Sequence, residues 1–537
     1  MQSLSINRLS SESLFRIAVI LVSILVAVLC KRLLLSAFTS GDDGYTAFAA
    51  IAPGGVWASA VEMAKFQGRF YQLVLYPLAM LPFVGESIVV ANLFKIYTFL
   101  MVLAGFWCLC RELIGRAAAL VCLALFVCLF DTVGGSYNPF HGLPLWFGLG
   151  CALVMFSLGL LLRSFRKQTS PNSAYFVFFL ALLSYEILLL YVPLFMLFHF
   201  YNGESNSPRL SKQEILKVLL RCRVLFYYVA AYLVLYAGYK HFYPGTYSGV
   251  DGLTFAPANE MLRPILNFSL RSLYFRMGQF GQQAFSPSGF AFAIVGVAAV
   301  LSAWGAASSA TGDSARRSVA AQRITAAGPL ILVLLGYVFV PNVLFGFTLR
   351  YRIWAGDGVE FYLGSFFSAF AFVLLLYVFL SRLMAFPTDR VVRYVGVMTL
   401  AFLLGSFVYS NSKNSENFFE QSRTMSIRWP VADWVSDRLR EAPVSRQLPS
   451  GTAQWLICGD GFSHNLELPT YFRNPDMIAD VEVYWSRYFS RNLGRDVKYV
   501  NKRDASAPCA ADFSMSYEKR TGVLIVAGEQ RTKSFDN

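Results

Sequence analysis

Residues 174–200 have the sequence AYFVFFLALLSYEILLLYVPLFMLFHF, a run of 27 residues in which Glu186 is the only acidic side chain. A helix needs about 20 apolar residues to cross the hydrocarbon core of a bilayer. The run is therefore long for one crossing and short for two, and Ser184, Tyr185 and Glu186 form a polar break near its centre. The choice between one helix and two decides which side of the membrane each later loop occupies.

The whole chain shares this apolar character. Of its 537 residues, 56% are hydrophobic and only 15% are Asp, Glu, Lys or Arg, whereas a soluble domain is about one-quarter charged. The composition excludes disordered, collagen-like and disulfide-rich classes, and an ordinary soluble enzyme as well. We therefore expect a polytopic α-helical membrane protein.

Apolar runs long enough to span a bilayer occur along most of the chain. The first, Phe15 to Phe38, has no small-residue cleavage site after it, so we expect an uncleaved anchor and not a signal peptide. The further runs are 88–110, 116–133, 143–162, 224–240, 286–305, 326–346, 361–383 and 393–410.

Loop charge favours a break in the 174–200 run. With two helices there, the loops 111–116, 163–167, 201–223, 306–325 and 382–393 all lie inside. These loops are rich in Arg and Lys, as cytoplasmic loops are. With one helix, the last three would move outside. The sequence therefore predicts about eleven crossings, a cytoplasmic N-terminus and an outside C-terminus. The net charge of +14 follows from this topology, and no basic stripe with stacking aromatic residues suggests nucleic-acid binding.

The composition becomes polar and mixed from about Asn411. We expect a membrane domain over residues 1–411 and a small extracytoplasmic α/β domain over 412–537. Residues 454–458 and 523–526 are typical of buried strands, and 477–493 of a helix. Cys458 and Cys509 either form a disulfide in an oxidising compartment or remain buried thiols. The nine cysteines have no zinc-site spacing.

The first outside loop, residues 39–87, holds the most informative polar residues. Asp42 and Asp43 follow the first span directly, and the sequence Gln67-Gly68-Arg69-Phe70-Tyr71 comes later in the loop. Two adjacent carboxylates repel each other, which raises one pKa and suits a general base; a carboxylate pair can also bind a metal. A solvated loop with glycine turns explains the aspartates equally well.

Two other outside segments carry polar side chains that are candidates for a binding or catalytic site. The loop after the span 116–133 contains Tyr137, Asn138 and His141, of which the histidine is more often structural than catalytic in such a setting. Glu186 is an ionisable group in an apolar run, which marks a functional candidate. The alternative interpretation is that the break simply brings Glu186 to the interface with water.

Basic residues in outside loops run against the charge rule and therefore call for a ligand. Arg binds phosphate through paired hydrogen bonds, so a lipid phosphate is the ligand that we consider first. For Lys31 and Arg32, at the end of the first span, snorkelling to ordinary headgroups is the better explanation. Arg350 and Arg352 lie near Asp357 and Glu360 and fit both explanations. The candidates are Lys240, His241, Arg263, Arg271, Arg276, Arg350 and Arg352.

Three motifs in the first 200 residues together resemble the GT-C superfamily of membrane glycosyltransferases. They are the acidic pair, the Gly68-Arg69-aromatic sequence, and a long span that ends in Cys110-Arg111-Glu112-Leu113-Ile114-Gly115. The resemblance is clearest over residues 15–200 and is greatest to bacterial O-antigen glucosyltransferases and related proteins. Members of this superfamily use polyprenyl-phosphate sugars as donors.

The resemblance implies an inverting sugar transfer at the outer face of a bacterial inner membrane. Asp42 or Asp43 would be the base for the acceptor hydroxyl, and Arg69, Tyr71 and the outside basic residues would bind the donor phosphate. Some relatives bind Mg or Mn near the acidic pair, while many need no metal. The acceptor would be a cell-envelope glycan, a lipid-linked intermediate or a protein. The alternative is a transporter or flippase in which Glu186 and the arginines line a path, although inverted repeats and matched broken spans are lacking.

Overall fold

A computed structural model describes the helical part of the chain and four strands. The described residues are 10–35, 55–84, 88–129, 140, 144–202, 212–245, 254–270, 285–309, 329–356, 362–385, 390–426, 454–459, 486, 490, 496–501, 513–518 and 523–526. The chain divides into two compact units. The first comprises residues 1–35, 62–75 and 91–418, and the second comprises 36–61, 76–90 and 419–537.

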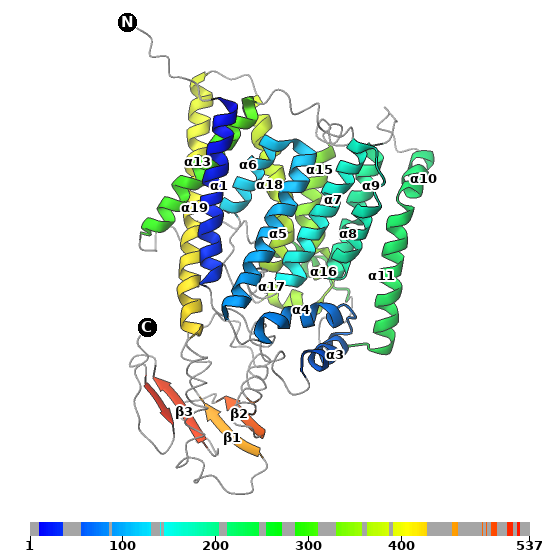
Figure 1. The fold of residues 1–537 in the computed structure, drawn as a ribbon, viewed down its shortest axis with the longest axis vertical. Coiled ribbons are helices and arrows are strands. Elements are labelled where there is room, and N and C mark those ends of the chain that lie inside the picture. The colour runs from blue at the N-terminus through cyan, green and yellow to red at the C-terminus, as the bar shows by residue number, and fades with distance from the viewer. Residues whose placement is uncertain are drawn as a thin grey trace. The chain divides into compact units, whose positions relative to one another are not determined.

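Most expected spans form helices close to their predicted limits (Figure 1). These are α1 (Ser11–Leu34), α5 (Ile88–Ile114), α6 (Arg116–Leu129), η1 (Pro144–Leu149) with α7 (Gly150–Lys167), α11 (Arg223–Phe242), α13 (Pro287–Ser309), α15 (Pro329–Phe339) with η6 (Val340–Asn342) and α16 (Val343–Gly346), and α18 (Tyr362–Ala385). Ser10 caps α1, because its side chain accepts a hydrogen bond from the Ser13 backbone N–H.

Several of these helices are suited to a bilayer. Among the described residues, five are long and apolar enough to cross a membrane, or six if a bent pair of helices is one span; six further apolar helices are shorter. This confirms the prediction of a helical, membrane-type protein.

The 174–200 run is broken where its polar residues predicted a break. It forms α8 (Asn172–Leu182), η2 (Glu186–Tyr191) and α9 (Val192–Tyr201). Tyr175 at the start of α8 hydrogen-bonds His199 at the end of α9, and the Phe178 and Phe195 rings lie 4.6 Å apart. The two helices are therefore antiparallel, and the chain reverses direction at the break.

Small residues and aromatic rings form the core of the first unit. A Cβ on Gly105 of α5 would lie 2.7 Å from the Ala152 carbonyl oxygen of α7, so these helices approach to backbone contact. Helix α6 is buried along nearly its whole length, and its Phe126 stacks on Phe370 of α18 at 4.9 Å. These contacts hold the bundle that carries the residues described below.

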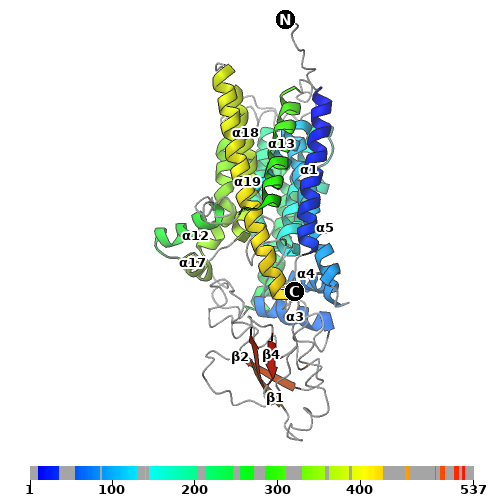
Figure 2. The same ribbon diagram turned by 90° about the vertical axis from the view of Figure 1, so that its left-hand side faces the viewer.

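Some segments expected to be loops are helical, and one helix is longer than predicted. The loop segments contain α3 (Gly55–Gln67), α4 (Gln72–Val84), α10 (Lys212–Arg221), α12 (Ala258–Leu270) and α17 (Leu349–Gly356). The last apolar run belongs to α19, which extends over Arg390–Ser426 and so continues past the predicted domain boundary at 411. Figure 2 shows α12 and α17 beside each other, where Arg352 donates hydrogen bonds to the Thr254 carbonyl and hydroxyl oxygens.

Four strands form the described part of the second unit near the C-terminus. They are β1 (Gln454–Gly459), β2 (Asp496–Asn501), β3 (Phe513–Glu518) and β4 (Val523–Val526), in the sheet order β2-β1-β3-β4. Strand β1 is parallel to both neighbours, and β3 is antiparallel to β4. Both predicted strands are present, and β2 and β3 are additional. The predicted helix 477–493 lies outside the described residues except for two positions.

Candidate functional site

A tight turn between α3 and α4 places the Gly68-Arg69-Phe70-Tyr71 sequence. Gly68 has a φ of +63°, and its backbone N–H donates to the Lys65 carbonyl while the Arg69 N–H donates to Ala64. This is the Schellman arrangement that ends many helices, and glycine adopts its left-handed position without strain. The turn therefore ends α3 abruptly and exposes the next three side chains to the neighbouring helices.

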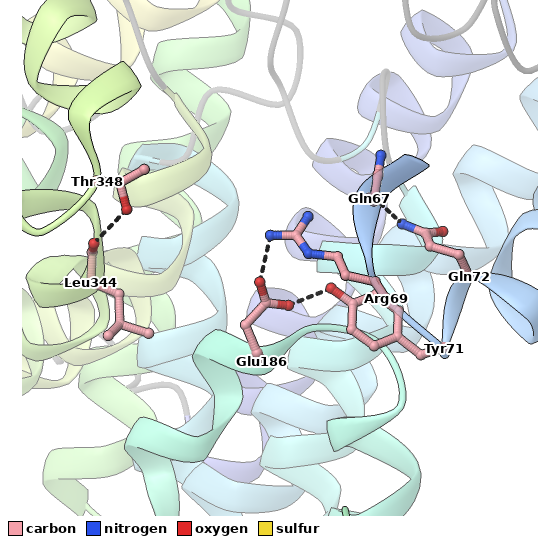
Figure 3. Close-up of polar contacts among 7 residues, drawn as sticks. All are labelled: Gln67, Arg69, Tyr71, Gln72, Glu186, Leu344 and Thr348. Atoms are coloured by element: carbon pink, nitrogen blue, oxygen red, sulfur yellow. Dashed lines mark hydrogen bonds and ion pairs between the residues drawn. The ribbon is translucent and has the colours of Figure 1, made fainter. Parts of the chain in front are cut away.

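The turn brings Arg69 and Tyr71 to Glu186 at the break of the α8–α9 hairpin (Figure 3). The Arg69 Nη2 lies 2.5 Å from Glu186 Oε1, and the Tyr71 hydroxyl donates to Glu186 Oε2. The side chains of Arg69 and Glu186 are only 15% and 21% exposed. Three residues predicted separately as substrate-binding candidates thus form one half-buried polar cluster.

Three further tyrosines surround this cluster, one next to Glu186 and two from other helices. The Arg69 guanidinium lies over the Tyr185 ring, 5.7 Å from its centroid, and Tyr185 hydrogen-bonds Tyr351 of α17. Tyr232 of α11 is fully buried within electrostatic reach of Glu186 and Arg69. Its hydroxyl has no hydrogen-bond partner among the described residues, although a buried hydroxyl normally has one.

Burial and charge fix the protonation states of the cluster. Burial raises the pKa of Tyr71 well above its usual value; the Arg69 charge opposes this shift and the Glu186 charge adds to it. Burial alone would lower the pKa of Arg69, but Glu186 and the neighbouring tyrosines together outweigh burial and raise that pKa. At neutral pH the site therefore contains a guanidinium cation and neutral phenols.

Aromatic contacts hold the turn against α11. Phe70 packs on Tyr232 and Tyr239 with ring centroids 5.7 and 6.5 Å apart, and Lys65 lies over the Tyr243 ring. A side chain on Gly68 would meet the Tyr243 carbonyl oxygen at 2.9 Å. The turn and the end of α11 are thus in backbone contact.

A second set of hydrogen bonds holds the turn to the bundle. Gln72 donates to Gln67 at 2.8 Å and accepts from the Trp146 indole of η1 at 2.9 Å. Gln72 and Trp146 are both buried, so these bonds are shielded from water and contribute to the position of Arg69.

The other predicted basic residues have different settings. Arg352 is used structurally, because both of its terminal nitrogens donate to Thr254. Lys240 lies 5.9 Å from the Tyr236 ring centroid, on the same helix as Tyr232. Arg350 is half-buried next to Tyr351, while His241 and Arg263 are exposed.

Several predicted site residues lie outside the described part of the chain. These are the two proposed bases and five candidate ligands: Asp42, Asp43, Tyr137, Asn138, His141, Arg271 and Arg276. Among the described residues, no group of three or more His, Cys, Asp or Glu side chains is arranged to hold a metal ion.

Sequence reasoning did not single out some residues of the site. Tyr185 could have been found from its position next to Glu186. Tyr232 belongs to a series at helical spacing, Tyr232, Tyr236 and Tyr239, which places three phenols on one face of α11, and Tyr243 follows directly after the helix. Tyr351 is brought in from a distant segment, which no local pattern shows.

The cluster is chemically suited to bind a ligand with anionic and hydroxyl groups. A guanidinium offers directed hydrogen bonds together with its charge, and phenols both donate and accept. No protein-family model matches the chain, and a comparison with curated proteins gives no match either.

Proposed function

We propose that the protein is an integral membrane glycosyltransferase of the GT-C type, which moves a sugar from a polyprenyl-phosphate donor to an acceptor hydroxyl with inversion. The observation that carries this proposal is the half-buried Arg69–Glu186–Tyr71 cluster. Arg69 and Tyr71 belong to the same loop, residues 39–87, as Asp42 and Asp43. A cation held in a partly desolvated place is suited to the charge that develops on a leaving phosphate.

The topology that we propose has about eleven crossings, with the N-terminus in the cytoplasm and the C-terminal segment outside. Figure 1 shows α17 and the C-terminal end of α11 at the end of the bundle opposite to α10. The basic residues Arg163, Arg166 and Lys167 end α7, and Tyr185 contacts Phe147 of η1, at the other end of that segment. The cluster thus lies at the end that is poorer in α7 charge, which by the positive-inside rule supports an outside position for it.

In the proposed mechanism, each group has one role. A carboxylate of Asp42 or Asp43 takes the proton of the acceptor hydroxyl as that oxygen bonds to the anomeric carbon. The bond from that carbon to the phosphate oxygen breaks, and the phosphate leaves with its electron pair. Arg69 stabilises the phosphate charge, while Glu186 and Tyr71 hold Arg69 in place. A phosphate is already a good leaving group, so a general acid is not required.

Transfer from labelled polyprenyl-phosphate sugars by the purified protein tests this proposal. We expect Asp42→Asn or Asp43→Asn to lower the rate by about 100-fold or more, since general bases contribute that much. Glu260→Gln in α12 is the control, because it removes an exposed carboxylate elsewhere. Wild-type rates in both aspartate variants would contradict the assignment of the base. Substrate transport that depends on Glu186, with no transfer, would favour the transporter instead.

A further inference from the structure

Helix α10 has an apolar face that the protein itself does not cover. Its sequence is KQEILKVLLR, and Val218 faces the bundle and is buried. Ile215, Leu216, Leu219 and Leu220 are 42%, 58%, 37% and 59% exposed. At 100° per residue these four side chains form one continuous stripe, which lies away from Val218.

The direction of this stripe is fixed by contacts within the protein. α10 meets α11 at Cys222 with a bend of 66°, and Cys222 is fully buried. The Tyr175 hydroxyl lies 3.5 Å from the Arg221 carbonyl oxygen and hydrogen-bonds His199. Because α8 and α9 hold the joint in this way, the bend does not require a ligand.

Because of the bend, α10 does not run parallel to the spanning helices. α11 runs along the bundle (Figure 1) and exposes large side chains such as Tyr227 and Val234, as a helix facing lipid does. A helix bent by 66° from such a neighbour lies closer to the membrane plane than to its normal. The apolar stripe of α10 then meets the boundary between acyl chains and headgroups.

The charges of α10 complement a negative surface. Lys212, Lys217 and Arg221 are exposed, and Arg223 follows at the start of α11. Glu214 is the only acidic residue of the helix. Long basic side chains beside an apolar stripe extend to the headgroup level while their stems remain in contact with apolar surface.

We propose that α10 is an interfacial helix that binds the surface of an anionic phospholipid bilayer. The stripe Ile215, Leu216, Leu219 and Leu220 enters the boundary of the acyl chains, and the positive charges of Lys217 and Arg221 attract the lipid phosphates. Each basic residue near an anionic leaflet adds about fivefold to binding. This inference does not rest on the proposed glycosyl transfer.

Backbone hydrogen exchange of the full chain in nanodiscs tests the proposal. Nanodiscs of phosphatidylcholine alone are compared with nanodiscs that also contain phosphatidylglycerol, at equal ionic strength. We expect the amides of residues 213–221 to exchange about tenfold more slowly in the anionic nanodiscs. The amides of α11 serve as an internal reference, because their exchange does not depend on headgroup charge.

Matched variants separate this binding from a general charge effect. Lys217→Gln with Arg221→Gln should abolish the difference between the two lipids. Arg163→Gln with Lys167→Gln is the control, since it removes the same charge from exposed positions one turn apart on α7 and should leave the difference intact. Leu216→Ser with Leu220→Ser should speed exchange in both lipids without loss of the fold, because both side chains are exposed.

Three results would overturn the proposal. The first is equally fast exchange of α10 in both lipids, which would mean a solvated helix. The second is an equal effect of the α7 control on α10. The third is protection of α10 that does not depend on lipid charge and increases with protein concentration, which would mean that the stripe binds a second copy of the chain.

Discussion

At the scale of single residues, the Gly68–Tyr71 sequence decides the geometry of the site. Gly68 turns the chain with its left-handed φ of +63°, which directs Arg69 and Tyr71 to the same carboxylate. Glu186 forms an ion pair with Arg69, so a phosphate approaching Arg69 competes with this carboxylate. Arg69 is thus both a candidate phosphate ligand and part of an ion pair in the structure.

Gly68→Ala should destabilise the protein more than Gly55→Ala does. Both glycines have a positive φ, at +63° and +74°, and an alanine in that region costs about 1–2 kcal/mol. Only Gly68 has backbone atoms where the new Cβ would lie, with the Tyr243 oxygen at 2.9 Å; nothing lies within 4 Å of a Cβ at Gly55. Thermal unfolding of both variants measures the difference. Equal midpoints would contradict the close contact with α11.

At the scale of elements, the cluster joins three segments that are far apart in the sequence. The Arg69–Glu186 pair joins the 67–71 turn to the break before η2, and the Phe70 ring joins the same turn to α11. The α8–α9 hairpin is what places Glu186 at the bundle end, because its helices run antiparallel and reverse at residues 183–185. A single straight helix would have kept Glu186 in mid-span.

A double-mutant cycle measures how strongly Arg69 and Glu186 are coupled in the free energy of unfolding. We expect Arg69→Met and Glu186→Gln to couple by about 1–3 kcal/mol in the free energy of unfolding, because each single change leaves a half-buried partner unpaired. The control cycle uses Arg16 and Glu12, an exposed pair on α1, which should couple by about 0.3–0.5 kcal/mol. Unfolding in mixed micelles gives both values. Similar coupling in the two cycles would contradict a buried joint.

At the scale of the whole molecule, the orientation that we propose in the membrane rests on loop charge and the hairpin together. The hairpin reverses the chain, so in the proposed topology the end of α7 and the end of α9 face the same compartment. The basic loops on both sides of the hairpin then agree with one cytoplasmic face.

Alkaline phosphatase fusions test this orientation. We expect fusions after Gln168 and after Asn202 to be inactive, since both points would be cytoplasmic, and a fusion after Ser426, at the end of α19, to be active. Ser426 is preferred to Ser410 because Ser410 lies within α19. Opposite results at Gln168 and Asn202 would mean that the hairpin segment crosses only once. Protein amounts by immunoblot control for differences in expression.

The sequence by itself determined the class of fold, the position of most apolar helices, the break in the 174–200 run and two strands of the C-terminal sheet. These features depend on local composition, because apolar length and alternation act within one segment. It also named Arg69, Tyr71 and Glu186 as separate candidates. It gave no sign of the helices in the loop segments 55–67, 72–84, 212–221, 258–270 and 349–356, which are shorter or less apolar than a span.

Only the tertiary structure decided that Arg69 forms an ion pair with Glu186, which also accepts a hydrogen bond from Tyr71, and that Tyr185, Tyr232 and Tyr351 surround this cluster. Such contacts arise from the reversal of the hairpin and the bend of the turn at Gly68, which set distances between residues more than 100 positions apart. The same holds for Arg352, whose role in holding Thr254 is fixed by the packing of α12 and α17. No pattern within one segment encodes a distance of this kind.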